Sequence, residues 1–171
     1  ENFKKQAVRL GTDVRFGMIT SVVFDRNGGS HIVTVDGKTE IECETVIIST
    51  GASAKWLNIP SEQRLNGSGV SACAVCDGFF YKGQDVAIVG AGDTAAEEAT
   101  YLSKLCRKVY MIVRKSEMRA SKAMQHRVKN TANIEILWNS ETLDIIVKDA
   151  VEGALVKNNA TRETRNLTIT G

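Results

Sequence analysis

The sequence predicts an α/β fold in which a parallel sheet follows an antiparallel β-meander. Residues 18–43 alternate between apolar and polar positions and are divided by glycine turns, a pattern typical of antiparallel strands. Apolar runs at 85–89 and 109–113 are separated by a stretch with helical periodicity, which is the order of a βαβ unit. The only proline, Pro60, lies between these two regions. We therefore expect two structural units joined by a connector.

A short helix and the meander are predicted before residue 45. Apolar residues recur at helical spacing from Phe3 to Leu10, and Gly11 ends the helix. Turns are expected at Asn27-Gly28-Gly29 and at Asp36-Gly37-Lys38. The strands predicted around these turns are 18–24, 32–35 and 40–43.

A buried strand and a connector are expected next. Residues 45–50 contain Val46-Ile47-Ile48, an apolar β-branched run typical of a strand buried on both faces. The chain is predicted to turn sharply after it, at 49–52. Residues 53–69 show no periodic pattern, so they are expected to connect two domains, 1–53 and 54–171.

The second domain begins with the βαβ unit. A strand at 85–89 is followed by a helix at about 93–105 and by a strand at 109–113. The residues expected on the inner side of the helix are Ala95, Ala99, Leu102 and Leu105. The elements predicted after it are a helix at 122–130, a strand at 134–137 and a weaker hairpin through 145–147, 154–156 and 167–171.

Composition and charge exclude some classes of function. The 22 basic and 20 acidic residues nearly cancel, so binding to nucleic acid or to an anionic membrane is not expected. No apolar run approaches the roughly 20 residues that span a bilayer, and residues 1–5 do not form a signal peptide. We expect a soluble protein of the reducing cytoplasm. Because a predicted element is interrupted at each end, we also expect the chain to be a piece of a longer protein.

A glycine motif marks a nucleotide site. Gly90-Ala91-Gly92-Asp93-Thr94-Ala95 has the form G-x-G-x-x-A and stands between a strand and a helix. In such a loop the first glycine permits the turn, the second lets a pyrophosphate approach the backbone, and the small last residue lets helix and strand pack closely. The alternative is a structural glycine turn. The same spacing at 67–72 has no strand before it and is interpreted as a chance match. The motif predicts a three-layer, Rossmann-like domain.

Basic residues at the end of the second strand indicate which dinucleotide is bound. An acidic residue there suits NAD, whereas a basic residue suits the 2′-phosphate of NADP. Here Arg114 and Lys115 follow the strand, at close to the expected interval of about 20 residues after the glycine loop, and Arg119 is near. This favours NADPH over NADH. The alternative is a solvated basic surface.

A Cys-x-x-Cys motif stands just before the βαβ unit. Cys73-Ala74-Val75-Cys76-Asp77-Gly78 has no second pair of zinc ligands, because the other two cysteines are solitary, so a metal site is not expected. Two thiols at this spacing can close an exchangeable disulfide, and one of them often has a pKa around 7 or lower. Asp77 is a candidate for the proton transfer that accompanies thiolate formation; a helix cap or turn is the alternative.

Together these motifs resemble the low-molecular-weight thioredoxin reductases of the bacterial and plant type. In that family an FAD domain is interrupted in sequence by an NADPH domain that carries the dithiol. The match is specific and lies between residues 47 and 120. The segments that carry the resemblance are 47–53, 69–80, 90–99 and 114–120.

The resemblance implies a role for each matching residue. Residues 1–53 would be the end of the first FAD-domain segment, with Thr50, Gly51 and Ala52 near the flavin, and 54–171 would be the NADPH domain. Electrons would pass from NADPH through FAD to the Cys73–Cys76 disulfide and then to thioredoxin. Cys76 would lie next to the flavin, Cys73 would attack thioredoxin, and Asp77 would be the acid. Arg114, Lys115 and Arg119 would hold the 2′-phosphate. The full-length protein would be a homodimer. Because the nucleotide loop and the dithiol lie on one domain and both must reach the same flavin, we also expect this domain to rotate about connectors near Ala54 and Thr168.

The sequence departs from this family in two respects. Val113 stands where many relatives have histidine before the basic pair. No second glycine fingerprint is present, so the chain alone is expected to hold little or no FAD and to be inactive. The rival prediction is the flavoprotein subunit of an alkyl hydroperoxide reductase, which typically uses NADH and has an acid where Arg114 stands. A nucleotide-binding module without turnover and a half zinc site completed across a dimer are two further hypotheses for these motifs.

Overall fold

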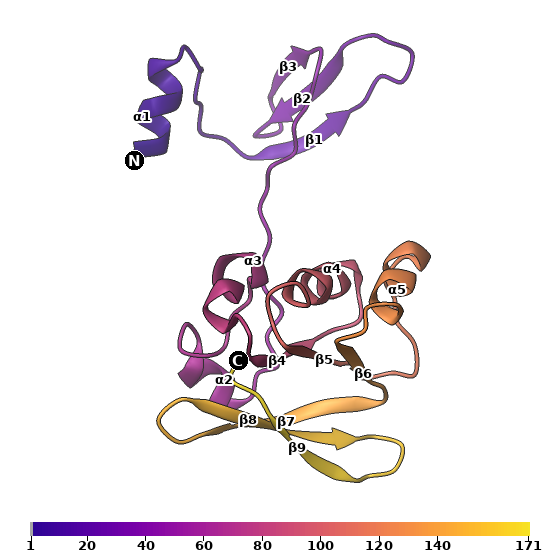
Figure 1. The fold of residues 1–171 in the computed structure, drawn as a ribbon. Coiled ribbons are helices and arrows are strands. Elements are labelled where there is room, and N and C mark those ends of the chain that lie inside the picture. The colour runs from indigo at the N-terminus through magenta and orange to yellow at the C-terminus, as the bar shows by residue number, and fades with distance from the viewer. Residues whose placement is uncertain (1) are drawn as a thin grey trace. The chain divides into compact units, whose positions relative to one another are not determined.

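A computed structural model describes residues 2–171 and divides the chain into two compact units, Glu1–Ala52 and Ser53–Gly171 (Figure 1). Each unit has its own sheets: one antiparallel sheet in the first, and one parallel and one antiparallel sheet in the second. Among the described residues, no helix combines the length and the apolar character needed to cross a bilayer.

The first unit contains the predicted helix and meander. Helix α1 (Asn2–Arg9) precedes strands β1 (Ile19–Val23), β2 (His31–Val35) and β3 (Thr39–Cys43), which pair antiparallel in that order. The turn before β2 is held by the Asp25 carboxylate, which accepts the backbone N–H groups of Asn27 and Gly29 at 2.7 and 2.9 Å. Asp36 and Gly37, both with positive φ, form the turn before β3.

The predicted buried strand at 45–50 is wrong. These residues form no strand, and Ile47 and Ile48 are 85% and 68% exposed. The β-branched run has the propensity for a strand, but a strand also needs a neighbour to pair with its backbone N–H and C=O groups. No strand between residues 2 and 171 pairs with this segment. It follows that propensity alone did not decide its conformation.

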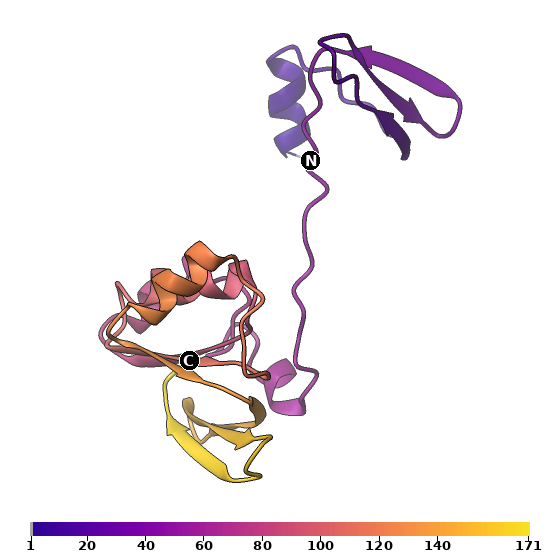
Figure 2. The ribbon, with the colours of Figure 1, turned by 90° about the vertical axis from the view of Figure 1, so that its right-hand side faces the viewer.

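The second unit has three layers (Figures 1 and 2). A parallel sheet β4-β5-β6 is covered on one face by helices and on the other by an antiparallel sheet β7-β8-β9. The predicted α/β class with a parallel sheet is therefore confirmed. The elements are α2 (Pro60–Leu65), α3 (Ala74–Asp77), η1 (Gly78–Tyr81), β4 (Asp85–Val89), α4 (Asp93–Leu102), β5 (Lys108–Ile112), α5 (Lys122–Lys129), β6 (Ile134–Leu137), β7 (Ser140–Val147), β8 (Val151–Asn158) and β9 (Thr164–Thr168).

The central strand β5 explains how the layers hold together. Its side chains alternate between the two faces of the sheet, with Val109 and Met111 in the core beneath the helices and Ile112 in the core beneath the antiparallel sheet. All three are at most 1% exposed. Burial on both faces is the reason that this strand reads as a continuous apolar run. The glycine loop begins at the end of β4 and the basic loop at the end of β5. These buried strands therefore position both loops.

The connector predicted at 53–69 is only partly unstructured, because α2 lies within it. Pro60 occupies the first turn of this helix, where its missing N–H costs nothing. Glu62, only 5% exposed, accepts the backbone N–H groups of Leu57 and Asn58, both at 2.8 Å. Ser61 Oγ accepts the N–H of Ile145 in β7 at 3.2 Å. These hydrogen bonds hold α2 to the preceding segment and to β7. With six residues, the helix is too short to show helical periodicity in the sequence.

Replacing Glu62 with glutamine is expected to lower the free energy of unfolding by about 1–2 kcal/mol. The amide keeps only one acceptor oxygen, so one of the two backbone N–H groups is left facing a donor in a buried place. Chemical denaturation of the two chains measures the difference. Glu152→Gln, an exposed carboxylate in β8, is the matched control and should change stability by less than about 0.5 kcal/mol. Equal losses in the two variants would contradict a special role for Glu62.

Candidate nucleotide and disulfide site

The glycine loop begins where β4 ends. Gly90 has a φ of +145°, which side chains rarely adopt, and its N–H donates to the carbonyl of Ile112 at 3.1 Å. A Cβ at Gly90 would stand 2.8 Å from the Cβ of Ala95. Both positions therefore require small residues, which lets α4 approach the end of β4 closely.

Gly92 leaves open space in front of the first turn of α4. It is the N-cap residue with a φ of −90°, and a Cβ placed on it would meet nothing within 4 Å. No side chain caps this helix. Within residues 2–171, the amides of Gly92, Thr94 and Ala95 donate no hydrogen bond. A helix start with open space and free N–H groups suits an anion, and this geometry fits the pyrophosphate of a dinucleotide.

The basic loop after β5 is fastened to the glycine loop. The N–H groups of Arg119 and Ala120 both donate to the carbonyl of Ala91, at 2.8 and 2.9 Å. The carboxylate of Asp93 accepts the N–H of Ser121 at 2.9 Å, and this bond lowers the pKa of Asp93 below its usual value. Asp93, expected from the motif to lie at the cofactor, thus has a structural partner of its own.

The three basic residues of the loop after β5 are available to bind an anion. Arg114, Lys115 and Arg119 are exposed, and in the described part of the chain their side chains have no hydrogen-bond or ion-pair partner. Val113, which precedes them, is fully buried. The attachment of Arg119 to Ala91 places its loop against the glycine loop. The residues present therefore fit a nucleotide that carries an additional phosphate.

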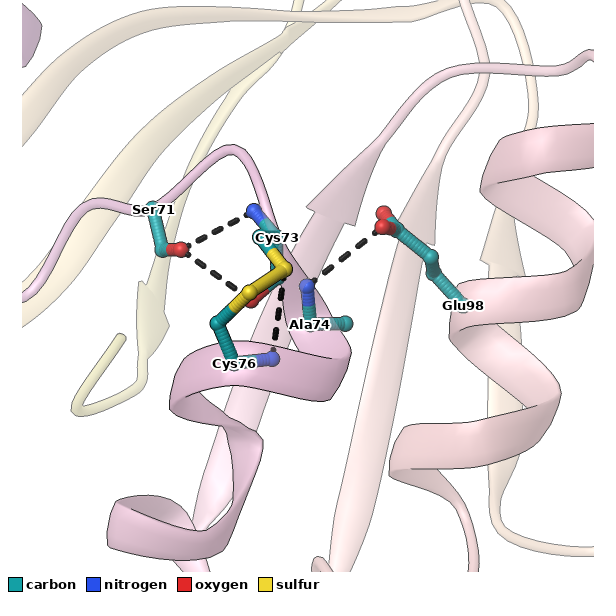
Figure 3. Close-up of a disulfide and its surroundings, with 5 residues drawn as sticks. All are labelled: Ser71, Cys73, Ala74, Cys76 and Glu98. Atoms are coloured by element: carbon teal, nitrogen blue, oxygen red, sulfur yellow. Dashed lines mark hydrogen bonds between the residues drawn. A yellow bond between two sulfur atoms is a disulfide. The ribbon is translucent and has the colours of Figure 1, made fainter. Parts of the chain in front are cut away.

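Cys73 and Cys76 form a disulfide at the start of α3, as Figure 3 shows. The predicted pairing of these two cysteines is confirmed. Their Cα atoms are 5.3 Å apart, and Cys73 Sγ accepts the N–H of Cys76 at 3.2 Å. Ser71 Oγ accepts the N–H of Cys73 at 3.0 Å and supports the turn into the helix. Cys73 is half-buried, whereas Cys76 is exposed.

The other two cysteines are free thiols, and Cys43 Sγ donates to the carbonyl of His31 at 3.7 Å. Cys43 is half-buried in β3, and Cys106 is buried in the main core. Burial raises the pKa of the Cys106 thiol, with a smaller contribution from the charge of Asp85. Within residues 2–171 no group of three or more His, Cys, Asp or Glu side chains is placed to hold a metal ion.

Asp77 ends α3 beside the disulfide. Its N–H donates to the carbonyl of Cys73 at 3.2 Å, and the residue is half-buried. Burial raises the pKa of Tyr81 above its usual value, and the charge of Asp77 raises it further. The carboxylate of Asp77 is therefore near enough to act on its surroundings electrostatically.

Two features of the disulfide region were missed in the sequence. Val75 of α3 and Phe79 and Phe80 of η1 are 65%, 66% and 74% exposed, so large apolar side chains lie at the surface of the two short helices that begin at the disulfide. Exposed apolar clusters of this kind mark contacts with other molecules. Glu98 of α4 accepts the N–H of Ala74 at 3.4 Å (Figure 3). The adjacent residues Phe79 and Phe80 could have indicated the exposed apolar side chains. No sequence pattern indicated the contact between Glu98 and Ala74.

Thr50, Gly51 and Ala52 belong to the first unit. They are exposed and lie outside any helix or strand, and Gly51 has a φ of +77°. Their exposure leaves them accessible to a cofactor.

Comparisons with known proteins agree with one another. A sequence model described as pyridine nucleotide-disulphide oxidoreductase matches residues 2–169. The chain is 41% identical over 171 residues to a thioredoxin reductase of Streptomyces clavuligerus, covering all of this chain and 52% of that one. It is 41% identical over 176 residues to a thioredoxin reductase of Vibrio cholerae, covering 54% of it. The chain thus spans about half the length of these relatives.

Solved structures show the same similarity. A thioredoxin reductase from Giardia duodenalis superposes with a TM-score of 0.74 at 34% identity, over 99% of this chain and 55% of that one. The thioredoxin reductase of Lactococcus lactis superposes with a TM-score of 0.72 at 30% identity, again over 99% and 55%.

Proposed function

The chain belongs to the pyridine nucleotide-disulphide oxidoreductase family, and from this premise we propose that the natural protein containing it is an NADPH-dependent thioredoxin-disulfide reductase. The observation that carries the proposal is the joint presence of the Cys73–Cys76 disulfide and the glycine loop on one structural unit. Helix α3, which carries the disulfide, packs against α4, which carries the free amides.

The nucleotide is held by two parts of this unit. The free amides of Gly92, Thr94 and Ala95 bind the pyrophosphate, and Arg114, Lys115 and Arg119 bind the 2′-phosphate. NADPH supplies a hydride, and FAD, when bound, delivers electrons in pairs to a disulfide. We assign Thr50, Gly51 and Ala52 to the flavin side, with 1–53 as the FAD-domain segment and 54–171 as the NADPH domain.

The dithiol carries out the exchange with the substrate. Two electrons and two protons convert the Cys73–Cys76 disulfide into two thiols. The Cys73 thiolate attacks a disulfide of the partner and forms a mixed disulfide; Cys76 then attacks Cys73 Sγ, which restores the internal disulfide and releases the reduced partner. The N–H of Cys76, which points to Cys73 Sγ, stabilises the attacking thiolate. Asp77 transfers the proton that accompanies thiolate formation.

The partner is a protein disulfide, and we propose thioredoxin. The exposed side chains of Val75, Phe79 and Phe80 supply an apolar contact around the disulfide. One relative, 39% identical over 171 residues, is a bifunctional thioredoxin reductase/thioredoxin of Mycobacterium leprae. We further propose that the full-length protein is a homodimer and that it is cytoplasmic; the two free cysteines are in keeping with a reducing compartment.

The flavoprotein subunit of an alkyl hydroperoxide reductase is the second candidate, and it is not favoured. Arg114 stands where the NADH-dependent proteins have an acid, and the relatives described above are thioredoxin reductases.

Two experiments test the proposal. Thiol titration of the denatured chain should find two free thiols before reduction and four after it. The natural protein that contains this sequence should then reduce thioredoxin with NADPH and far more slowly with NADH. An unchanged thiol count with stoichiometric zinc would contradict the redox role. Reduction of a peroxidase partner in place of thioredoxin would favour the second candidate.

A further inference from the structure

Glu98 joins the nucleotide helix to the dithiol helix. It lies in the middle of α4, whose first turn presents the free amides, and its side chain reaches across to α3 (Figure 3). There Oε1 accepts the N–H of Ala74 at 3.4 Å. Ala74 directly follows Cys73 and packs on the main core, so this contact touches the backbone of the disulfide loop itself.

The contact places a negative charge at the amide that directly follows Cys73, the residue whose thiol must become a thiolate. Two amides in the first turn of α3 donate to different acceptors. The N–H of Cys76 points to Cys73 Sγ, and the N–H of Ala74 points to Glu98. Both amides would otherwise favour a negative charge on Cys73. Glu98 occupies one of them and adds a like charge nearby, which disfavours the thiolate.

We propose that Glu98 is a positioning residue that keeps the Cys73–Cys76 dithiol strongly reducing. Anything that destabilises the thiolate of the reduced form shifts the equilibrium toward the disulfide, so the dithiol gives up its electrons more readily. The inference rests on the proposed function, because only a dithiol that passes electrons to a partner needs this property. Other charged or titratable groups on the elements packed around α3 are Asp77 on α3, Tyr81 on η1, and Asp93, Glu97 and Tyr101 on α4.

The test is the redox equilibrium of this chain with glutathione. Two glutathione molecules reduce the Cys73–Cys76 disulfide and leave one glutathione disulfide, so the ratio of oxidised to reduced chain gives the equilibrium constant. In Glu98→Gln the acceptor oxygen remains and the charge is lost. This variant should be reduced about three- to tenfold more readily; tenfold corresponds to about 30 mV.

Two further variants separate charge from packing. Glu97→Gln, an exposed neighbour on the same helix with the same change in charge, should leave the equilibrium within about twofold of the wild type. Glu98→Ala should shift it in the same direction as Glu98→Gln. A shift in Glu98→Ala alone, equal shifts in Glu98→Gln and Glu97→Gln, or no shift at all would overturn the proposal.

The thiol itself provides a second readout. In the reduced chain, the alkylation rate of Cys73 as a function of pH should rise at lower pH in Glu98→Gln than in the wild type, because the thiolate is no longer opposed by the carboxylate. An unchanged profile contradicts the proposal. Neither measurement uses thioredoxin, FAD or NADPH, so the outcome is independent of whether the natural protein reduces thioredoxin.

Discussion

Replacing Arg114 and Arg119 together with alanine is expected to weaken NADPH binding by about a hundredfold or more while leaving NADH binding nearly unchanged. A hydrogen bond to a charged group contributes roughly 1.5–3 kcal/mol, and two such bonds are lost with the 2′-phosphate contacts. NADH has no phosphate for these side chains to bind. The loop should keep its place, because it is attached through the backbone N–H groups of Arg119 and Ala120 to Ala91.

Isothermal calorimetry with both nucleotides measures this difference. The control is the double change Lys122→Ala with Arg127→Ala, which removes two exposed cations from α5 and alters the net charge equally. The control should change NADPH affinity by no more than a few-fold, through long-range attraction alone. Equal losses for NADPH and NADH in the Arg114/Arg119 variant would show that the basic loop is only a solvated surface.

Replacing Gly92 with alanine is expected to leave the fold intact and to weaken NADPH and NADH binding alike by about a hundredfold or more. The backbone at Gly92 has a φ that alanine accepts, and nothing lies within 4 Å of the added Cβ. The methyl group would occupy the space through which the pyrophosphate must approach the amides of α4. Loss of two charged hydrogen bonds of roughly 1.5–3 kcal/mol each gives the expected magnitude.

Gly90→Ala is the informative comparison. There the φ of +145° is unfavourable for alanine, and the new Cβ would stand 2.8 Å from Ala95 Cβ, so stability itself should fall. Thermal unfolding therefore separates the two glycines: Gly92→Ala keeps the melting temperature and Gly90→Ala lowers it. Nucleotide affinity retained in Gly92→Ala would place the phosphates elsewhere on the unit.

The features that could be predicted from the sequence depend on neighbours along the chain. The order strand, glycine loop, helix and strand at 85–113 is a pattern of local periodicity, and the structure contains each of these elements. The pairing of Cys73 with Cys76 is likewise local, since the two residues are three positions apart. Such features are dictated by short-range geometry, which a sequence displays directly.

Only the tertiary structure decided the features that depend on distant partners. The run at 45–50 has strand propensity, but no strand among the described residues pairs with it. Helix α2 is held to β7 by Ser61, whose partner Ile145 is 84 positions away. The approach of Glu98 to Ala74 joins residues 24 positions apart. The attachment of the basic loop to the glycine loop likewise spans a long stretch of chain. The sequence alone determined which groups could bind a nucleotide or exchange a disulfide, whereas the packing of α3, α4 and β5 decided which of them lie together, because a contact between distant residues exists only after the chain has folded.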